Sequence, residues 1–184
     1  MKHTQPLVNE HDGILLMLEI MDRIGDRIEK GEQVNVKHLE QILEFLNVFA
    51  DQCHHAKEEE ILFPALVENG LPEQGGPIPV LKREHEAARS YIQGLAEGIA
   101  EFQPDSNSAR AKILKNSRAY RSLLTQHIAK ENSILFPLAD AYIGHEQQDK
   151  IYEEYERIEV ERIGMGRHEQ FHELLKKLKG MYLS

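Results

Sequence analysis

The chain of 184 residues has one cysteine and no long apolar run. With Cys53 alone, an intrachain disulfide and a zinc site built on several thiolates are both excluded. No segment approaches the ~20 consecutive apolar residues that a membrane-spanning helix needs. The first residues, MKHTQPLVNEHDG, lack the basic-then-apolar order of a signal peptide. We therefore expect a cytoplasmic protein that has no membrane partner.

Positive charge is also scarce. Lysine and arginine number 22 against 31 aspartates and glutamates, which gives a formal net charge of −9 at pH 7. Nucleic-acid binding needs a clustered basic surface, and the basic residues of this chain are spread along its length. The composition therefore predicts no nucleic-acid partner. Histidine, in contrast, is plentiful, with 10 residues.

Signals for β-strands are nearly absent, and apolar residues recur at steps of three and four, which is typical of helices. Segments rich in glycine and proline separate the helical stretches. Asn35 and Ser106 stand where helix N-caps are expected. The pattern predicts helices over residues 5–30, 36–69, 78–102, 107–141 and 146–180.

Four consecutive helices joined by modest loops predict an all-α fold, an up-down-up-down four-helix bundle over about residues 5–141. An additional C-terminal helix, about 146–180, is expected to pack outside the bundle or to form a homodimer contact. We expect residues 1–184 to form a single domain.

Two motifs occur twice. HHAKEEEILFP at 54–64 returns 73 residues later as HIAKENSILFP at 127–137. EHD at 10–12 returns 74 residues later as EHE at 84–86. Nearly equal offsets indicate a duplicated helical hairpin, whose two copies would face each other across the core.

The repeated histidines and glutamates fall within apolar stripes. A single histidine on such a stripe is usually a hydrogen-bonded core residue, and a His/Glu pair four residues apart is usually a surface pair. Burying two carboxylates without compensation would cost several kcal/mol each, and a divalent metal removes that cost. We therefore predict a metal site formed by His11, His54, Glu58, His85, His127 and Glu131.

Six protein ligands would saturate one ion, whereas two ions could share them, with two histidines each and bridging carboxylates. Each ion would keep an open position, which suits a reactive site better than a structural one. Imidazole and carboxylate without thiolate suit iron, manganese or zinc, and the spacing alone does not choose among them.

These motifs together resemble the hemerythrin-like HHE cation-binding domain over about residues 5–140. The resemblance implies a hemerythrin-like bundle that holds two non-haem iron ions with an oxo or hydroxo bridge, bound by the six residues above. Leu81 stands where the oxygen-carrying members have a further histidine. The pattern is closer to the four-histidine, two-glutamate sites of bacterial iron-centre repair proteins.

Other residues near the motifs have less specific patterns. His55 and Glu59 shift the His/Glu register by one, but Ile128 and Asn132 replace them in the second copy, so we expect His55 near the site or at the surface. His168 and His172 could form a second metal site, a lid ligand or an exposed pair.

Cys53, Tyr91 and Tyr120 are expected to be core residues. The Phe-Pro pairs at 63–64 and 136–137 are expected to bend their helices.

The resulting hypothesis is a non-haem di-iron protein that binds or reacts with O2, NO or peroxide, in sensing, scavenging or an iron-centre stress response. The alternative is an iron storage or sensing module without redox turnover. A dinuclear zinc or manganese hydrolase and a plain helical interaction protein are less consistent with the sequence, since no separate acid/base residue is visible and the buried carboxylates need a cation.

Overall fold

The computed structural model describes residues 3–103 and 105–183, and these form helices joined by short loops, with no strand among them. The first bundle helix is α1 (Gln5–Glu29). The third is α4 (Pro77–Ala100). The second and fourth are continuous helices in which stretches of π-helix alternate with α-helix.

The second bundle helix is composed of α2 (Val36–Glu44), the π segments η1 (Phe45–His55) and η2 (Glu58–Leu62), and α3 (Phe63–Glu68). The fourth is composed of α5 (Asn107–Lys130), the π segment η3 (Glu131–Leu135) and α6 (Phe136–Tyr142). The C-terminal part follows as α7 (His145–Ile158), η4 (Glu159–Ile163) and α8 (Arg167–Tyr182).

The predicted N-caps are confirmed. The Asn35 side chain accepts a hydrogen bond from the Lys37 amide at 3.0 Å, and the Ser106 hydroxyl accepts one from the Ala109 amide at 3.2 Å. Each bond satisfies an amide that the first helical turn leaves without a partner. Both caps start the helix that ends a hairpin, so they help to fix where each hairpin turns.

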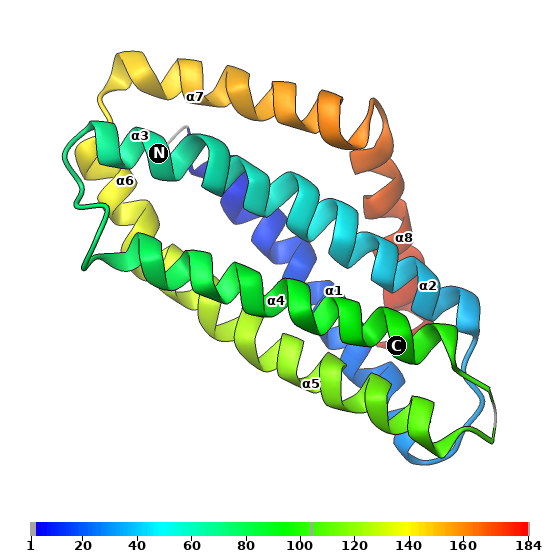
Figure 1. The fold of residues 1–184 in the computed structure, drawn as a ribbon. Coiled ribbons are helices and arrows are strands. Elements are labelled where there is room, and N and C mark those ends of the chain that lie inside the picture. The colour runs from blue at the N-terminus through cyan, green and yellow to red at the C-terminus, as the bar shows by residue number, and fades with distance from the viewer. Residues whose placement is uncertain (1–2, 104, 184) are drawn as a thin grey trace.

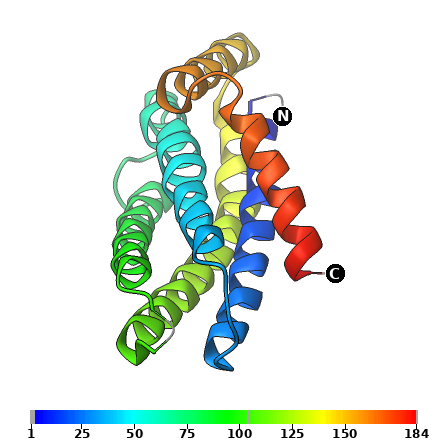
Figure 2. The same cartoon turned by 90° about the vertical axis from the view of Figure 1, so that its right-hand side faces the viewer.

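The four bundle helices form a closed ring, as Figures 1 and 2 show. Helix α1 packs on α5, α5 on α4, α4 on α2 and η1, and η1 returns to α1. The predicted up-down-up-down four-helix bundle is therefore confirmed. Helix α7 crosses the second bundle helix near η2, and α8 lies along α1.

Two apolar clusters fill the bundle. The larger one includes Ile14, Phe45 and Phe49, and the smaller one includes Leu7 and Leu62. The six predicted metal-site residues lie between these clusters along the bundle axis, because the same helix stripes that supply the apolar side chains also carry them. The site is therefore a polar layer sealed on both sides by hydrocarbon.

The prediction of one continuous C-terminal helix over 146–180 is wrong in detail. Gly164 and Gly166 adopt φ angles of +86° and +78°, a region that favours glycine, and the helix breaks there into α7 with η4 and α8. The break lets α8 fold back onto the bundle (Figure 2).

The apolar face of α8 is buried within the same chain. Phe171 contacts the rings of Phe45 and Phe49 edge-on, at centroid distances of 5.5 and 5.9 Å. Leu175 and Leu178 join the larger apolar cluster. A homodimer through this helix stays a prediction.

Within residues 3–103 and 105–183, no helix combines the length and the apolar character that crossing a membrane requires. The predicted cytoplasmic location stays a prediction.

Close contact between α4 and α5 depends on Gly98. A Cβ at this position would lie 2.9 Å from Ile113 Cγ1 and 3.1 Å from the Ile113 amide nitrogen. We expect Gly98→Ala to lower the free energy of unfolding by about 1–3 kcal/mol, because the helices must separate. Gly180→Ala is the matched control: its Cβ meets open space within α8, so it should leave stability unchanged or raise it by up to about 1 kcal/mol. Urea unfolding measures both, and equal effects would contradict this account of the packing.

Candidate metal centre

The structure brings the six predicted residues together as two overlapping groups. His11 and His54 form one group with Glu58 and Glu131, and all four offer ligand atoms within 4.8 Å of one another. His85 and His127 form the second group with the same two glutamates. We call these the His11–His54 half and the His85–His127 half. All six side chains are almost fully buried.

Within each half, the two histidines point the same ring atom at each other. The Nε2 atoms of His11 and His54 are 3.0 Å apart, and those of His85 and His127 are also 3.0 Å apart. Two imidazole nitrogens bound at about 2.1 Å and at a right angle to one ion would be separated by about 3.0 Å. The spacing therefore fits two histidines converging on one metal ion.

The carboxylates of Glu58 and Glu131 are fully buried, and their nearest polar neighbours are histidines of the same cluster. The Nε2 atoms of His11 and His127 come within 3.1 and 2.9 Å of Glu131 oxygens. Even so, none of the four carboxylate oxygens of Glu58 and Glu131 has a well-directed hydrogen bond from any described residue. Such groups are costly to bury unless a cation binds them. The donor set and its unsatisfied oxygens together fit a pair of divalent ions.

Each histidine is held from behind by a side-chain oxygen at its Nδ1. These distances are 2.9 Å from His11 to Asn132, 2.8 Å from His54 to Glu10, 2.6 Å from His85 to Glu59, and 2.9 Å from His127 to Glu84. An acceptor at Nδ1 fixes the hydrogen there and leaves the Nε2 lone pair free for a metal. This arrangement is characteristic of metal-binding histidines.

The family comparison agrees with this geometry. Residues 3–139 match the family model of the hemerythrin HHE cation binding domain. The chain belongs to the hemerythrin HHE family.

Among the relatives of this hemerythrin domain are iron-sulfur cluster repair proteins YtfE from Yersinia pestis (strain Pestoides F) and Yersinia pseudotuberculosis serotype IB (strain PB1/+). Each is 30% identical over 130 residues, which cover 68% of this chain and 56% of the relative. The match thus spans little more than half the length of these relatives. No solved structure matches the chain significantly.

Electrostatics in this hemerythrin site show how strongly the carboxylates attract positive charge. Burial acts to lower the pKa of His85, but the carboxylates of Glu131, Glu58 and Glu59 outweigh it and raise the pKa to about 11. In Glu131, burial acts to raise the pKa, but the close imidazoles of His11, His127 and His85 lower it well below its usual range. Without a metal, protons on the imidazoles supply the positive charge, and metal binding would release them.

The hemerythrin glutamates start the two short π segments. In η2 the Phe63 amide bonds to the Glu58 carbonyl, and in η3 the Phe136 amide bonds to the Glu131 carbonyl. Proline follows each phenylalanine and cannot donate a backbone hydrogen bond, so the local register shifts by one residue. The sequence analysis predicted bends at the Phe-Pro pairs but did not predict the π turns. The repeated Phe-Pro pair was the only sign of these turns in the sequence.

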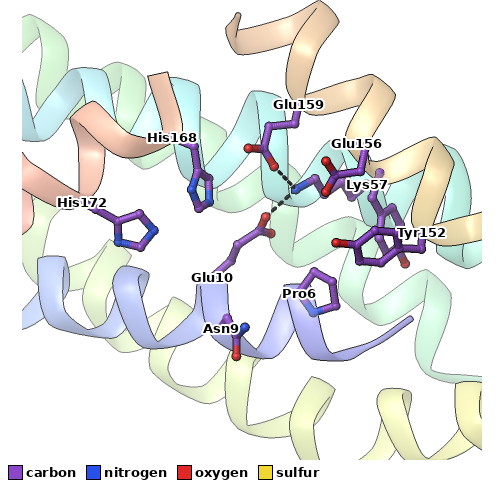
Figure 3. A pocket seen from close by; sticks show the side chains of 10 residues that line it. Pro6, Asn9, Glu10, Lys57, Tyr152, Glu156, Glu159, His168 and His172 are labelled. Carbon is purple, nitrogen blue, oxygen red and sulfur yellow. Dashed lines mark hydrogen bonds and ion pairs between the residues drawn. The ribbon is translucent and has the colours of Figure 1, made fainter. Parts of the chain in front are cut away.

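A pocket of about 250 Å³ lies outside the His11–His54 half, between α1 and the C-terminal helices (Figure 3). Lys57, almost fully buried, bridges Glu10 at 2.5 Å and Glu159 at 3.2 Å. Burial acts to raise the pKa of Glu10, but the His54 bond and the Lys57 charge lower it to about 2. Glu10 therefore connects the pocket wall to a histidine of the centre.

His168 and His172 line this pocket, and neither lies with the six clustered residues. Their rings are 4.6 Å apart, and His168 lies 5.2 Å from the ring of Phe49. A ligand atom of His168 lies within 4.8 Å of those of Glu10 and Glu159, but the Lys57 ammonium already supplies the positive charge between these acids. Both histidines therefore belong to the pocket wall, where His168 is partly buried and His172 is exposed.

Other residues near the centre are as buried as the sequence indicated. Cys53 is buried, and burial raises the pKa of its thiol to about 12. Tyr120 is buried, and Tyr91 packs partly buried against the larger apolar cluster. Tyr155 of α7, which the sequence did not single out, is also buried, and neither its hydroxyl nor that of Tyr120 has a hydrogen-bond partner among the described residues.

The oxygen behind each histidine can be tested directly. We expect Glu84→Gln to weaken metal binding by about 10–100-fold, because His127 loses its carboxylate partner. Glu86→Gln is the matched control, since it removes the same charge from an exposed position two residues along α4. Titration of iron against a competing chelator measures both affinities. A Glu84→Gln affinity equal to that of Glu86→Gln would show that this hydrogen bond does not tune the metal.

Proposed function

We propose that this protein binds two non-haem iron ions and acts in an oxidative or nitrosative stress response by binding or reacting with O2, NO or peroxide. The observation that carries the proposal is the pair of overlapping four-residue groups that share both glutamates. The proposed ligands are two histidines for each ion, with the carboxylates shared between the ions: His11, His54, Glu58, His85, His127 and Glu131.

Two observations support iron over the other metals that suit nitrogen and oxygen donors, which include manganese and zinc. The chain belongs to the hemerythrin family of cation-binding domains. The relatives named above are called iron-sulfur cluster repair proteins, which links this kind of domain to damaged iron centres. Because the chain spans little more than half of those relatives, we propose only the stress-response role and not a complete repair activity.

Bound iron would supply open coordination positions and a change between two oxidation states. The chain's own residues prepare the place for it. Oxygen atoms behind the four imidazoles hold each ring in position, and the two apolar clusters exclude water along the bundle axis. Small uncharged or singly charged ligands suit such a sealed site better than large substrates.

The first test is metal stoichiometry. We expect protein loaded anaerobically with Fe(II) to hold two irons per chain, and to gain near-ultraviolet absorption when O2 is admitted. Glu58→Ala with Glu131→Ala should abolish both, because the shared carboxylates are lost. Glu60→Ala is the control, since Glu60 is exposed and its ion pair with Arg162 is on the surface.

The other outcomes are equally informative. Two irons that do not react with O2, NO or peroxide would favour the storage or sensing alternative. A chain that takes up no iron, or one inert ion, would refute the dinuclear proposal.

Metal binding should also stabilise the fold. A ligand that binds only the folded state at about 1,000 times its dissociation constant adds about 4 kcal/mol to the free energy of unfolding. We expect a gain of this order on iron loading, measured as a higher urea midpoint. The double variant Glu58→Ala with Glu131→Ala should show the same midpoint with and without iron. A gain that persists in the double variant would place the stabilising metal elsewhere.

A further inference from the structure

His55 is a buried histidine beside the four proposed histidine ligands, and the six proposed ligands do not include it. Its side chain is fully buried, in contrast to the surface position that the sequence left open. Its Nδ1 lies 3.1 Å from an oxygen of Asp51, which in turn accepts a hydrogen bond from Arg89 at 2.8 Å. Its Nε2 has no hydrogen-bond partner among the residues described. A buried polar atom without a partner is costly, so the orphan Nε2 indicates that something binds there.

His55 lies next to one half of the centre, the His85–His127 half. Ring nitrogens of His55, His85 and His127 lie within 4.8 Å of one another. The ring of His55 also lies 5.7 Å, edge-on, from that of His127. A histidine with one unpartnered ring nitrogen therefore lies beside the His85–His127 half.

His55 is not placed to share an ion with His85. The two rings are stacked, with centroids 3.9 Å apart and planes only 14° from parallel. The lone pair of an imidazole nitrogen lies in the plane of its ring, so an ion bound by His85 lies near the His85 plane and away from the His55 plane. The Asp51 contact opposes the rotation that would bring Nε2 onto that ion. His55 therefore covers one side of the metal position.

The second copy of the repeat has no histidine at this position. The residue that corresponds to His55 in the second copy of the repeat is Ile128, which is buried and carries no polar side-chain atom. The two copies of the repeat therefore differ here: one has a hydrogen-bonding ring, and the other has a hydrocarbon side chain that packs in the larger apolar cluster.

We propose that Nε2 of His55 hydrogen-bonds a small exogenous ligand at the His85–His127 half, which makes this half the ligand-binding side of the centre. The inference rests on the proposed dinuclear function. With Nδ1 donating to Asp51, Nε2 presents a lone pair. It therefore selects a ligand that arrives with a hydrogen, such as hydroperoxide, or azide taken up with one proton.

Azide is the probe for the test, with the iron-loaded, oxidised full chain. We expect His55→Ile, which makes the two halves alike, to keep two irons per chain but to weaken azide binding by at least about 10-fold. His55→Gln should restore part of the affinity, because its amide reaches a similar position. Ile128→Val is the matched control in the other half and should leave azide affinity unchanged. The infrared stretch of bound azide should shift on transfer to D2O in the wild type and not in His55→Ile.

Three results would overturn the inference. Equal azide affinity in the wild type and His55→Ile would show that Nε2 does not contact the ligand. Five coordinating imidazoles per iron pair in the wild type, counted by X-ray absorption, would make His55 a metal ligand instead. A wild-type azide band insensitive to D2O would exclude the hydrogen bond even if His55→Ile failed to fold. Iron content separates these results from a failure of the proposed function, in which the wild type would hold no iron pair.

Discussion

Two carboxylates without hydrogen bonds, Glu58 and Glu131, impose the constraint on which the rest of the structure depends. Both lie in the middle of a bundle, between two apolar clusters, where an isolated negative charge is strongly unfavourable. Helical bundles normally avoid such positions. Here the π turns that begin at the glutamates, and the prolines that follow, direct both side chains to the same place. The bundle is therefore organised around two buried negative charges, which a pair of cations would balance.

Layers of alternating charge surround these two carboxylates. Imidazoles surround the inner carboxylates, and oxygen atoms, three of them from carboxylates, hold the outer edges of the imidazoles. Cations close the arrangement: Lys57 bonds Glu10, Lys130 bonds Glu84, and Arg89 bonds Glu59. Each layer fixes the orientation of the one inside it, so the metal-facing nitrogens are positioned before any ion arrives. Such preorganisation lowers the cost of ordering the ligands on binding.

The repeat explains which parts of this arrangement could be predicted from the sequence. Periodicity located the four bundle helices, and the nearly equal offsets of the two repeated motifs pointed to the six inward residues without any structure. The π turns were missed because a shift of one residue is invisible in a pattern with a period of 3.6 residues. The break at Gly164 was missed because glycine alone does not show which φ it adopts. The sequence did not single out His55 as a functional residue, because Ile128 replaces it in the second copy and comparing the copies selects only the residues that both contain.

Differences between the two copies of the repeat make the two halves of the centre unlike each other. His85 and His127 are both backed by carboxylates, Glu59 and Glu84, whereas His11 is backed by the neutral amide of Asn132. A carboxylate behind an imidazole makes it a stronger electron donor to a metal than an amide does. An ion bound at the His85–His127 half would therefore receive more electron density from its imidazoles, and His55, with its unpartnered nitrogen, lies beside that same half. Two departures from the repeat thus fall on one half, which is the pattern expected if the proposed pair of ions has separate roles in a site that began as a symmetric duplicate.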